Sequence, residues 1–367
     1  MVHISVGSAS FGTRAIHIGA EPNAETGAVI EPISLSTTYK QEGVGLNKGY
    51  EYSRCGNPNR VQLELLLASL EAGGGNAVTF ASGTATTTTV LQALGSNAHI
   101  VSMHDVYGGT YTQLFDDQIT ASFRDNTKLI WIESPTNPTL RIVDIHRIVQ
   151  LARKHPSNPL VLVDNTFLSP FYSSPLLLGA DAVVHSLTKY INGHSDVLMG
   201  ALIVPSASDH PRAAAFAERV RFLQNAGGPF QAHMTAAHGR NALRVASYLQ
   251  QISGPESSVE SVIYPGLAIH PRHQLAVKQL SPHSKSCQSG GVESLAQIPA
   301  RMTHGSIPET ERNALGITSN LVRLSIGIED ADDLIADIQQ ALATTLPHLA
   351  HKLTVCGSDN FSGQPAI

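Results

Sequence analysis

The first two hundred residues alternate short, continuous apolar runs with stretches of helical periodicity. The apolar runs predict strands at 77–80, 99–103, 128–133, 160–164 and 181–185. Apolar residues at helical spacing predict helices at 60–70, 83–94 and 144–154. Continuous apolar strands separated by helices are typical of a mostly parallel sheet that is covered on both faces. The pattern therefore predicts an α/β fold, in which ligands bind at the carboxyl ends of the strands.

The pattern changes on either side of this region. Residues 1–45 are polar and rich in Gly, Pro and Thr, which predicts an extended arm that packs on something else. The second half predicts helices at 209–223, 238–250 and 330–342, and strands at 259–264 and 321–326. We therefore divide the chain into four parts: an arm (1–45), a large domain (46–235), a smaller C-terminal α/β domain (236–346) and a loose tail (347–367).

Composition narrows the class of function. A net charge of -5 without a basic run argues against nucleic acid as a partner, and no apolar segment is long enough to cross a bilayer. The N-terminal residues lack the basic start and apolar core of a secretion signal. Cys55, Cys287 and Cys356 are widely spaced, and the 17 histidines form no metal-binding motif. These features predict a cytoplasmic protein with reduced thiols, no metal site and no membrane or nucleic-acid partner.

Lys189 follows the last predicted strand of the first half. It lies on the turn Ser186-Leu-Thr188-Lys189, between two hydroxyl groups and a loop that contains glycine. A lysine on such a turn can be partly desolvated, which lowers its pKa and frees a neutral amine to attack a carbonyl. Ser186 and Thr188 are suited to receive a phosphate at the same place. This is the chemistry of pyridoxal 5'-phosphate held by a lysine. A surface lysine after a strand is the alternative.

Polar residues follow other predicted strands as well. Gly83 and Thr84 open a helix after Ser82, where backbone N–H groups and the helix dipole favour a phosphate. Asp164 ends its strand, where a carboxylate can pair with a protonated pyridine nitrogen. An Asx turn is the alternative there. One strand–helix–strand crossover separates Asp164 from Lys189, which predicts that both lie at the same edge of the sheet.

Three further residues are candidates for the same site. Tyr107 follows the strand 99–103 beside two glycines, and its ring could lie flat over a pyridine ring, with a core tyrosine as the alternative. Asn137 brings an amide to another strand end, near the expected position of the phenolic oxygen of the cofactor. Arg323 stands inside an apolar strand, where an arginine is costly unless it is paired. A substrate α-carboxylate would pair with it in a bidentate manner.

A series of motifs in fixed order strengthens this interpretation. They are PISLSTT (32–38), YEYSRCGNP (50–58), FASG (80–83), DVYGGT (105–110), SPTNP (134–138), VDNTF (163–167), TKYINGHSD (188–196), YPGL (264–267), GVESL (291–295) and LVRLSIG (321–327). Together they resemble the cysteine/methionine-metabolism family of pyridoxal-phosphate enzymes, and within it most closely the eukaryotic cystathionine γ-lyases. The resemblance extends over nearly the whole chain.

The resemblance implies the fold-type I architecture of pyridoxal-phosphate-dependent transferases and a catalytic dimer, doubled to a tetramer. In that family, residues matching Tyr52 and Arg54 reach the phosphate of the neighbouring subunit. Lys189 would hold the cofactor and move protons, Asp164 would pair with the ring nitrogen, and Tyr107 would assist amine exchange and protonate the leaving sulfur.

The implied reaction is γ-elimination on cystathionine, a small sulfur amino acid, which yields cysteine, 2-oxobutanoate and ammonia. One alternative is γ-replacement, as in cystathionine γ-synthase or an O-acylhomoserine sulfhydrylase. The other is a truncated, inactive homologue.

Three stretches are shorter than the family pattern. They are 111–127, 228–248 and 281–290. In the first, Thr112 stands where the family usually has an arginine. The third leads directly to Val292. The third loss removes two strands, a helix and the segment whose glutamate separates γ-lyases from γ-synthases. A smaller domain with about two strands is marginal unless something covers its sheet. Helices built to pack on the lost strands would expose apolar faces.

Overall fold

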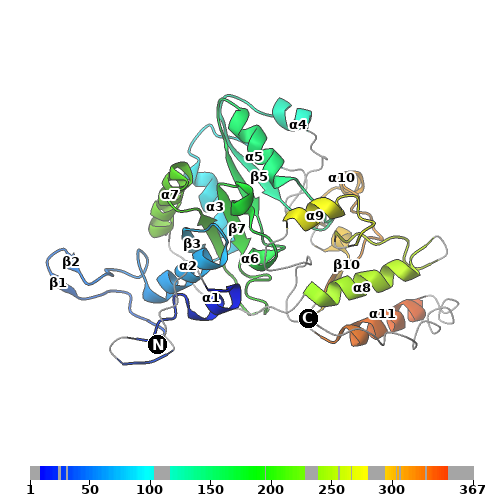
Figure 1. The fold of residues 1–367 in the computed structure, drawn as a ribbon, viewed down its shortest axis with the longest axis horizontal. Helices are drawn as coiled ribbons and strands as arrows, with labels where there is room; N and C mark the ends of the chain where they lie inside the picture. The colour runs from blue at the N-terminus through cyan, green and yellow to red at the C-terminus, as the bar shows by residue number, and fades with distance from the viewer. Residues whose placement is uncertain are drawn as a thin grey trace.

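The computed structural model describes residues 9–23, 26–29, 32–102, 116–194, 196–227, 239–254, 257–265, 267–279, 294–302, 304–305, 307–326 and 329–345. In this part of the chain a twisted sheet lies between helices (Figure 1). The N-terminal arm projects on one side of the sheet, and the C-terminal helices lie on the other (Figure 1).

The central sheet has six strands in the order β3-β8-β7-β6-β5-β4. Their bounds are β3 Asn76–Phe80, β4 His99–Ser102, β5 Thr127–Glu133, β6 Leu160–Asp164, β7 Ala182–Ser186 and β8 Gly200–Val204. β4 to β7 pair in parallel, whereas β8 is antiparallel to both β7 and β3. The predicted α/β fold with a mostly parallel sheet is confirmed. β8, the one reversed strand of this sheet, was not predicted from the sequence.

Helices cover both faces of this sheet. They are α2 Pro58–Leu70, α3 Gly83–Ala93, α5 Ile145–Lys154 and α7 Pro211–Gly227. The alternation along β6 shows why both faces are buried: Leu162 joins the core beneath α3 and α7, whereas Val161 and Val163 join the core beneath α5. α2 packs Leu67 against β7 and β8. The continuous apolar runs in the sequence therefore reflect strands with no solvent-facing side.

Glu64 ties α2 to β3 and α7 from a buried position. Its Oε1 accepts hydrogen bonds from the backbone N–H of Thr79 at 2.9 Å and from Thr79 Oγ1 at 3.0 Å, and its Oε2 accepts from Arg221 Nη1 at 2.6 Å. We expect Glu64→Gln to lower the free energy of unfolding by about 2–3 kcal/mol, because the charge-assisted bond to Arg221 loses its carboxylate. Urea denaturation measures this loss. A loss no larger than that of the surface control Glu309→Gln would contradict the expectation.

The C-terminal part contains a second, smaller sheet. β9 Leu295–Gln297 pairs antiparallel with β10 Arg323–Ser325, and the helices are α8 Gly239–Ile252, α9 His273–Gln279, α10 Glu309–Ala314 and α11 Ala331–Thr345. Val245 of α8 packs with Ile326, next to β10, and Ile335 and Ile338 of α11 join the same cluster. Only β10 corresponds to a strand predicted from the sequence, and two helices pack beside it.

The predicted strand at 259–264 is wrong, because these residues form no strand in the structure. Tyr264 is buried and Val262 packs beside it, so the apolar pattern does mark a buried segment. A segment in which apolar and polar residues alternate forms a strand only when a neighbouring strand pairs with its backbone hydrogen-bonding groups. In the part of the chain that the structure describes, β10 pairs with β9, and no strand pairs with residues 259–264.

The arm is less extended than predicted, since its described part contains the helix α1 Phe11–His17. A small hairpin follows, formed by β1 Gln41–Gly43 and β2 Leu46–Asn47. The remaining short elements are α4 Asp116–Ala121, α6 Ser169–Tyr172, and the 3-10 helices η1 Pro175–Leu178 and η2 Pro299–Arg301. The arm exposes large apolar side chains, among them Ile33, Leu35 and Val44.

Among the described helices, none combines the length and the apolarity that a bilayer crossing requires. The tail 347–367 lies outside the described residues. The division into four parts and the cytoplasmic location stay predictions.

Candidate active site

Lys189 lies on the turn that follows β7. Its backbone N–H donates to the carbonyl of Ser186 at 3.1 Å, and Thr188 Oγ1 both donates to the carbonyl of Met199 at 3.2 Å and accepts from its N–H at 3.0 Å. Thr188 therefore fixes the turn to the start of β8, and its hydroxyl proton is already used. The described residues leave Lys189 exposed, so they do not provide the desolvation that we expected.

The start of α3 lies against the end of β7. Ser82 caps α3 by accepting a hydrogen bond from the backbone N–H of Ala85 at 3.0 Å. A Cβ added to Gly83 would lie only 3.0 Å from Cβ of Ser186 and 3.1 Å from its Oγ. Gly83 and Ser186 are therefore in direct contact, and exposed Thr84 follows in the first turn of α3. The structure brings together the two parts of the predicted phosphate site.

Gly200 makes this close approach possible. A Cβ at this first residue of β8 would lie 2.3 Å from Thr86 Oγ1, 2.5 Å from the carbonyl oxygen of Ser82 and 2.8 Å from Cα of Gly83. Contacts this short exclude any larger side chain without movement of the backbone. A glycine here lets the first turn of α3 lie directly over β8.

Asp164 ends β6 at the same edge of the sheet. Its register partners are Glu133 on β5 and Val184 on β7. Oδ1 accepts a hydrogen bond from the backbone N–H of Thr166 at 3.0 Å, which is the Asx turn considered as the alternative, and Thr166 Oγ1 accepts from the N–H of Ser186 at 2.8 Å. Asp164, Ser186 and Gly83 are thus linked within one short network.

Burial raises the pKa of the Asp164 carboxyl, and the hydrogen bonds from Thr166 and the nearby His185 oppose that rise. A carboxylate whose pKa is raised by burial gains from a cationic partner. The site therefore fits the protonated ring nitrogen of pyridoxal phosphate in charge. The exposed amine of Lys189 and the N-terminus of α3 fit its carbonyl and its phosphate in chemistry.

Asn137 and Arg323 meet although 186 positions separate them in the chain. Arg323 Nη1 donates to Asn137 Oδ1 at 2.6 Å, and Nη2 donates to the side-chain oxygen of Gln297 on β9. This contact joins the small sheet to the loop after β5. The two predicted residues are therefore neighbours.

Tyr52 and Arg54 lie elsewhere, on the loop between the arm hairpin and α2. Both are exposed, and the guanidinium of Arg54 lies 5.5 Å from the ring centroid of Tyr52. Arg60 of α2 holds this loop by donating to the carbonyls of Ser53 at 3.0 Å and Arg54 at 3.1 Å. The hairpin next to the loop projects away from the central sheet (Figure 1). Tyr107 lies outside the described residues.

One buried ionisable pair beside this site was not predicted from the sequence. His185 Nε2 lies 3.0 Å from Glu71 Oε2, and both side chains are completely buried. Burial raises the pKa of the Glu71 carboxyl, and hydrogen bonding to His185 lowers it. The available signal was a histidine inside the apolar run of β7. No local pattern links it to a glutamate 114 positions earlier.

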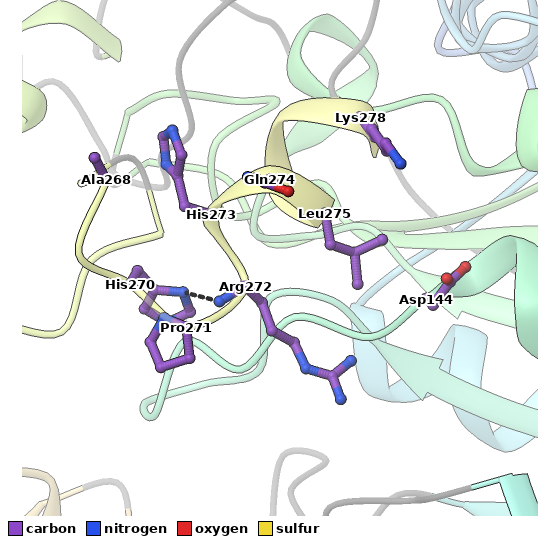
Figure 2. A pocket seen from close by; sticks show the side chains of 9 residues that line it. All are labelled: Asp144, Ala268, His270, Pro271, Arg272, His273, Gln274, Leu275 and Lys278. Atoms are coloured by element: carbon purple, nitrogen blue, oxygen red, sulfur yellow. Dashed lines mark hydrogen bonds between the residues drawn. The ribbon is translucent and has the colours of Figure 1, made fainter.

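The structure also has a surface hollow of about 590 Å³, between α9 and the start of α5 (Figure 2). It is lined by Asp144, Ala268, His270, Pro271, Arg272, His273, Gln274, Leu275 and Lys278. None of the predicted site residues lines it. The backbone N–H of Arg272 donates to His270 Nδ1 at 3.2 Å, and its guanidinium donates to the carbonyl of Ile142 at 3.0 Å. In the part of the chain that the structure describes, no group of His, Cys, Asp or Glu could hold a metal ion.

Comparisons with known proteins agree with this geometry. A family model described as "Cys/Met metabolism PLP-dependent enzyme" matches residues 12–287 and 281–343. Cystathionine gamma-lyase of Saccharomyces cerevisiae is 42% identical over 393 residues, which covers 91% of this chain and 98% of that protein. The crystal structure of the yeast cystathionine gamma-lyase superposes with a TM-score of 0.81 at 39% identity, covering 91% of this chain and 98% of that one. Cystathionine gamma synthase from Xanthomonas oryzae pv. oryzae, crystallised with cystathionine, gives 0.78 at 32% identity, with 91% and 98% covered.

The same comparisons bear on the shortened stretches. An alignment of 393 residues is longer than this chain of 367, so the chain has interior gaps relative to the yeast protein. The family model matches in two pieces that meet at 281–287, inside the stretch where we expect the largest loss. Both observations agree with a chain that lacks interior segments of its relatives.

Proposed function

The chain belongs to the Cys/Met metabolism PLP-dependent enzyme family, and from this premise we propose that it cleaves cystathionine by γ-elimination to cysteine, 2-oxobutanoate and ammonia. Family and relatives make it a pyridoxal 5'-phosphate-dependent enzyme that acts on carbon–sulfur bonds, with the fold-type I architecture. The observation that carries the proposal is the network at one edge of the sheet. There Gly83, Ser186 and Asp164 are in contact or hydrogen-bonded through Thr166, beside the turn of Lys189.

These residues have complementary roles in holding the cofactor. The N-terminus of α3, with Gly83, Thr84 and Ser186, would bind the phosphate, and Thr188 would support the turn beside it. Asp164 would hold the ring nitrogen in its protonated form. When bound, pyridoxal phosphate supplies an electron sink for the negative charge that develops at the substrate Cα.

The chain itself moves the protons and orients the substrate. Lys189 Nζ would hold the cofactor at rest, and after its release it would take the Cα proton and return one to the carbon skeleton. Tyr107 would protonate the leaving sulfur, and Asn137 would lie beside the phenolic oxygen of the ring. Arg323 would bind the substrate α-carboxylate in a bidentate manner, in place of the amide oxygens of Asn137 and Gln297.

A second subunit would complete the site. Tyr52 and Arg54 are exposed on the loop after the arm, and the arm also exposes Leu35 and Val44 to solvent. Exposed apolar side chains on a projecting arm support an interface with another copy of the chain. We therefore propose that the arm packs on a partner subunit, with Tyr52 and Arg54 at the phosphate of that subunit. Two such dimers would form a tetramer.

Mixing two inactive variants tests this arrangement. Lys189→Ala and Arg54→Ala should each be nearly inactive alone, because each spoils both sites of its dimer. A mixed dimer has one site with both changes and one site with neither. Random mixing should therefore restore about a quarter of wild-type activity, which co-expression and a turnover assay would measure. The absence of recovery in dimers shown to be mixed would contradict the shared site.

Product analysis distinguishes the reactions. We expect 2-oxobutanoate, ammonia and cysteine from cystathionine, at a higher kcat/KM than the formation of cystathionine from an O-acylhomoserine and cysteine. The similarity to a cystathionine gamma synthase supports the second activity as the alternative. A higher kcat/KM with the O-acylhomoserine would replace γ-elimination by γ-replacement. Failure of both reactions would favour a shortened, inactive homologue.

A further inference from the structure

Glu71 and His185 form a buried pair that the proposed reaction does not use. Glu71 caps the C-terminal end of α2, and His185 lies within β7. Their side chains are 0% exposed, and their facing atoms are 3.0 Å apart. Among the described residues, His185 Nδ1 is buried without a hydrogen-bond partner, and Glu71 is hydrogen-bonded by His185 and by the side chain of Asn165. Two ionisable groups are costly to bury with an unsatisfied atom, which calls for a functional explanation.

The pair lies across the sheet from Asp164. Val184 shares a face with its register partner Asp164, so the next residue, His185, points to the opposite face. That face is covered by α2, and Val183 packs there against Leu67. The two strands are joined at this level, because the N–H of Asn165 donates to the carbonyl of Val184 at 3.0 Å. His185 therefore directly follows Val184, the register partner of Asp164.

The charges around His185 are arranged asymmetrically. Glu71 faces it from the end of α2, and Asp164 influences it from β6. The buried side chain of Asn165, which follows β6, also hydrogen-bonds the Glu71 carboxyl. Apolar residues lie on the same side: β8 places Ala201 opposite His185, and Leu176 of η1 joins the core on that face. Burial raises the pKa of both carboxyls, and His185 opposes the rise at each of them. His185 is thus in direct contact with one buried carboxyl group and interacts electrostatically with another.

We propose that Glu71 and His185 share one proton and serve as a replaceable counter-charge for Asp164. While Asp164 has no cationic partner, the proton stays on His185 Nε2, and the imidazolium keeps Asp164 ionised. When a cationic ring nitrogen pairs with Asp164, the proton crosses the hydrogen bond. The N–H bond at Nε2 breaks, an O–H bond forms at Glu71 Oε2, and no proton is exchanged with solvent.

The ring nitrogen in this inference is that of pyridoxal phosphate, so the inference rests on the proposed function. Glu71 and His185 are positioning residues, because they act on the cofactor through Asp164. Their role would be to keep Asp164 ready for the cofactor without leaving an isolated charge in the core.

Infrared spectroscopy tests the position of the proton without the cofactor. A protonated carboxyl has a C=O stretching band that a carboxylate lacks, and Glu71→Gln identifies the contribution of Glu71. In the cofactor-free protein with Asp164 intact, Glu71→Gln should remove no such band. In the Asp164→Asn background it should remove one, because no carboxylate then holds the proton on His185. A band present in both backgrounds, or in neither, would overturn the inference. Glu64→Gln, which alters another buried glutamate of α2, is the matched control and should change neither comparison.

Loading the protein with pyridoxal phosphate tests the switch itself. The protonated Glu71 band should appear on loading and be missing in Glu71→Gln. His185→Asn should also make the Kd of the cofactor rise by up to about tenfold per pH unit lowered, relative to wild type, because Asp164 must then lose its own proton. The double variant Glu71→Gln/His185→Asn, which keeps a neutral hydrogen bond, should behave like His185→Asn. A wild-type Kd profile in both variants would overturn the inference. If wild type binds no cofactor through Lys189, the proposed function fails, and the cofactor-free comparison still decides where the proton lies.

Discussion

Replacement of Lys189 by alanine is expected to lower kcat/KM for cystathionine by at least about 10⁴-fold, because it removes both the covalent anchor and the proton carrier. Lys189 is exposed, and its turn is held by backbone bonds and by Thr188. Loss of the side chain should therefore leave the fold intact, which circular dichroism and thermal unfolding can check. Steady-state kinetics measure the effect on catalysis.

The matched control is Lys154→Ala, at the exposed end of α5. It removes a lysine of the same length from the same domain and should keep wild-type kinetics. General acid–base catalysis alone contributes about 10²–10⁴-fold, so if Lys189→Ala kept activity within about tenfold of wild type, Lys189 would be neither the covalent anchor nor the proton carrier.

The Asp164→Asn variant is expected to bind pyridoxal phosphate about 10–100-fold more weakly, because a hydrogen bond to a charged group is replaced by a neutral one. Titration of the cofactor, followed by its absorbance, measures the Kd. Asp125→Asn, at an exposed site, is the control and should bind like wild type.

In the cofactor-free protein, we expect Asp164→Asn to raise the stability of the fold, although it weakens binding of the cofactor. Burial raises the pKa of Asp164 above its unfolded value, so the folded state binds more protons than the unfolded state between those two pKa values. The free energy of unfolding contributed by this group is therefore present below the ordinary carboxyl pKa and falls as the pH rises through the raised one. The asparagine has no such decline, so the variant should unfold at a higher temperature than wild type at neutral pH without cofactor. A lower Tm together with an unchanged Kd would contradict both the burial cost and the ring-nitrogen partner.

The sequence predicted the elements whose pattern is local. Continuous apolar runs identified five strands of the central sheet, and strand-end polar residues identified Gly83, Ser186 and Asp164 as neighbours. The short apolar run at 200–204, which forms β8, was not assigned to any element from the sequence. Its reversed direction is seen only in its antiparallel pairing with β7 and β3, which is a tertiary arrangement.

Long-range pairs could not be predicted from periodicity or propensity. Arg323 was expected to need a partner, but only the fold shows that Asn137 accepts its hydrogen bond. The Glu71–His185 pair joins a helix end to a buried strand. Neither residue lies in a local sequence pattern that identifies it as one member of a buried pair. The exposure of Lys189 differs from the expected desolvation, because the described residues do not enclose the amine.

Helices pack on the small sheet, which supports the folding of a chain that has interior gaps relative to its relatives. α8 and α11 pack on β10 and bury Tyr264, so the described C-terminal residues form a core of their own. The contact between Arg323 and Asn137 fastens this core to the loop after β5. The shortened chain thus keeps the connection between the substrate-binding arginine that we propose and the sheet edge that carries Lys189.

The most direct test of the central claim is the absorption spectrum of the purified protein after pyridoxal phosphate has been added and the excess removed. The account predicts a band near ~420 nm in wild type that is absent from Lys189→Ala. That result would establish that the chain assembles its cofactor site at Lys189. No band, or an equal band in the variant, would contradict the account, and the family relationship would then describe ancestry without activity.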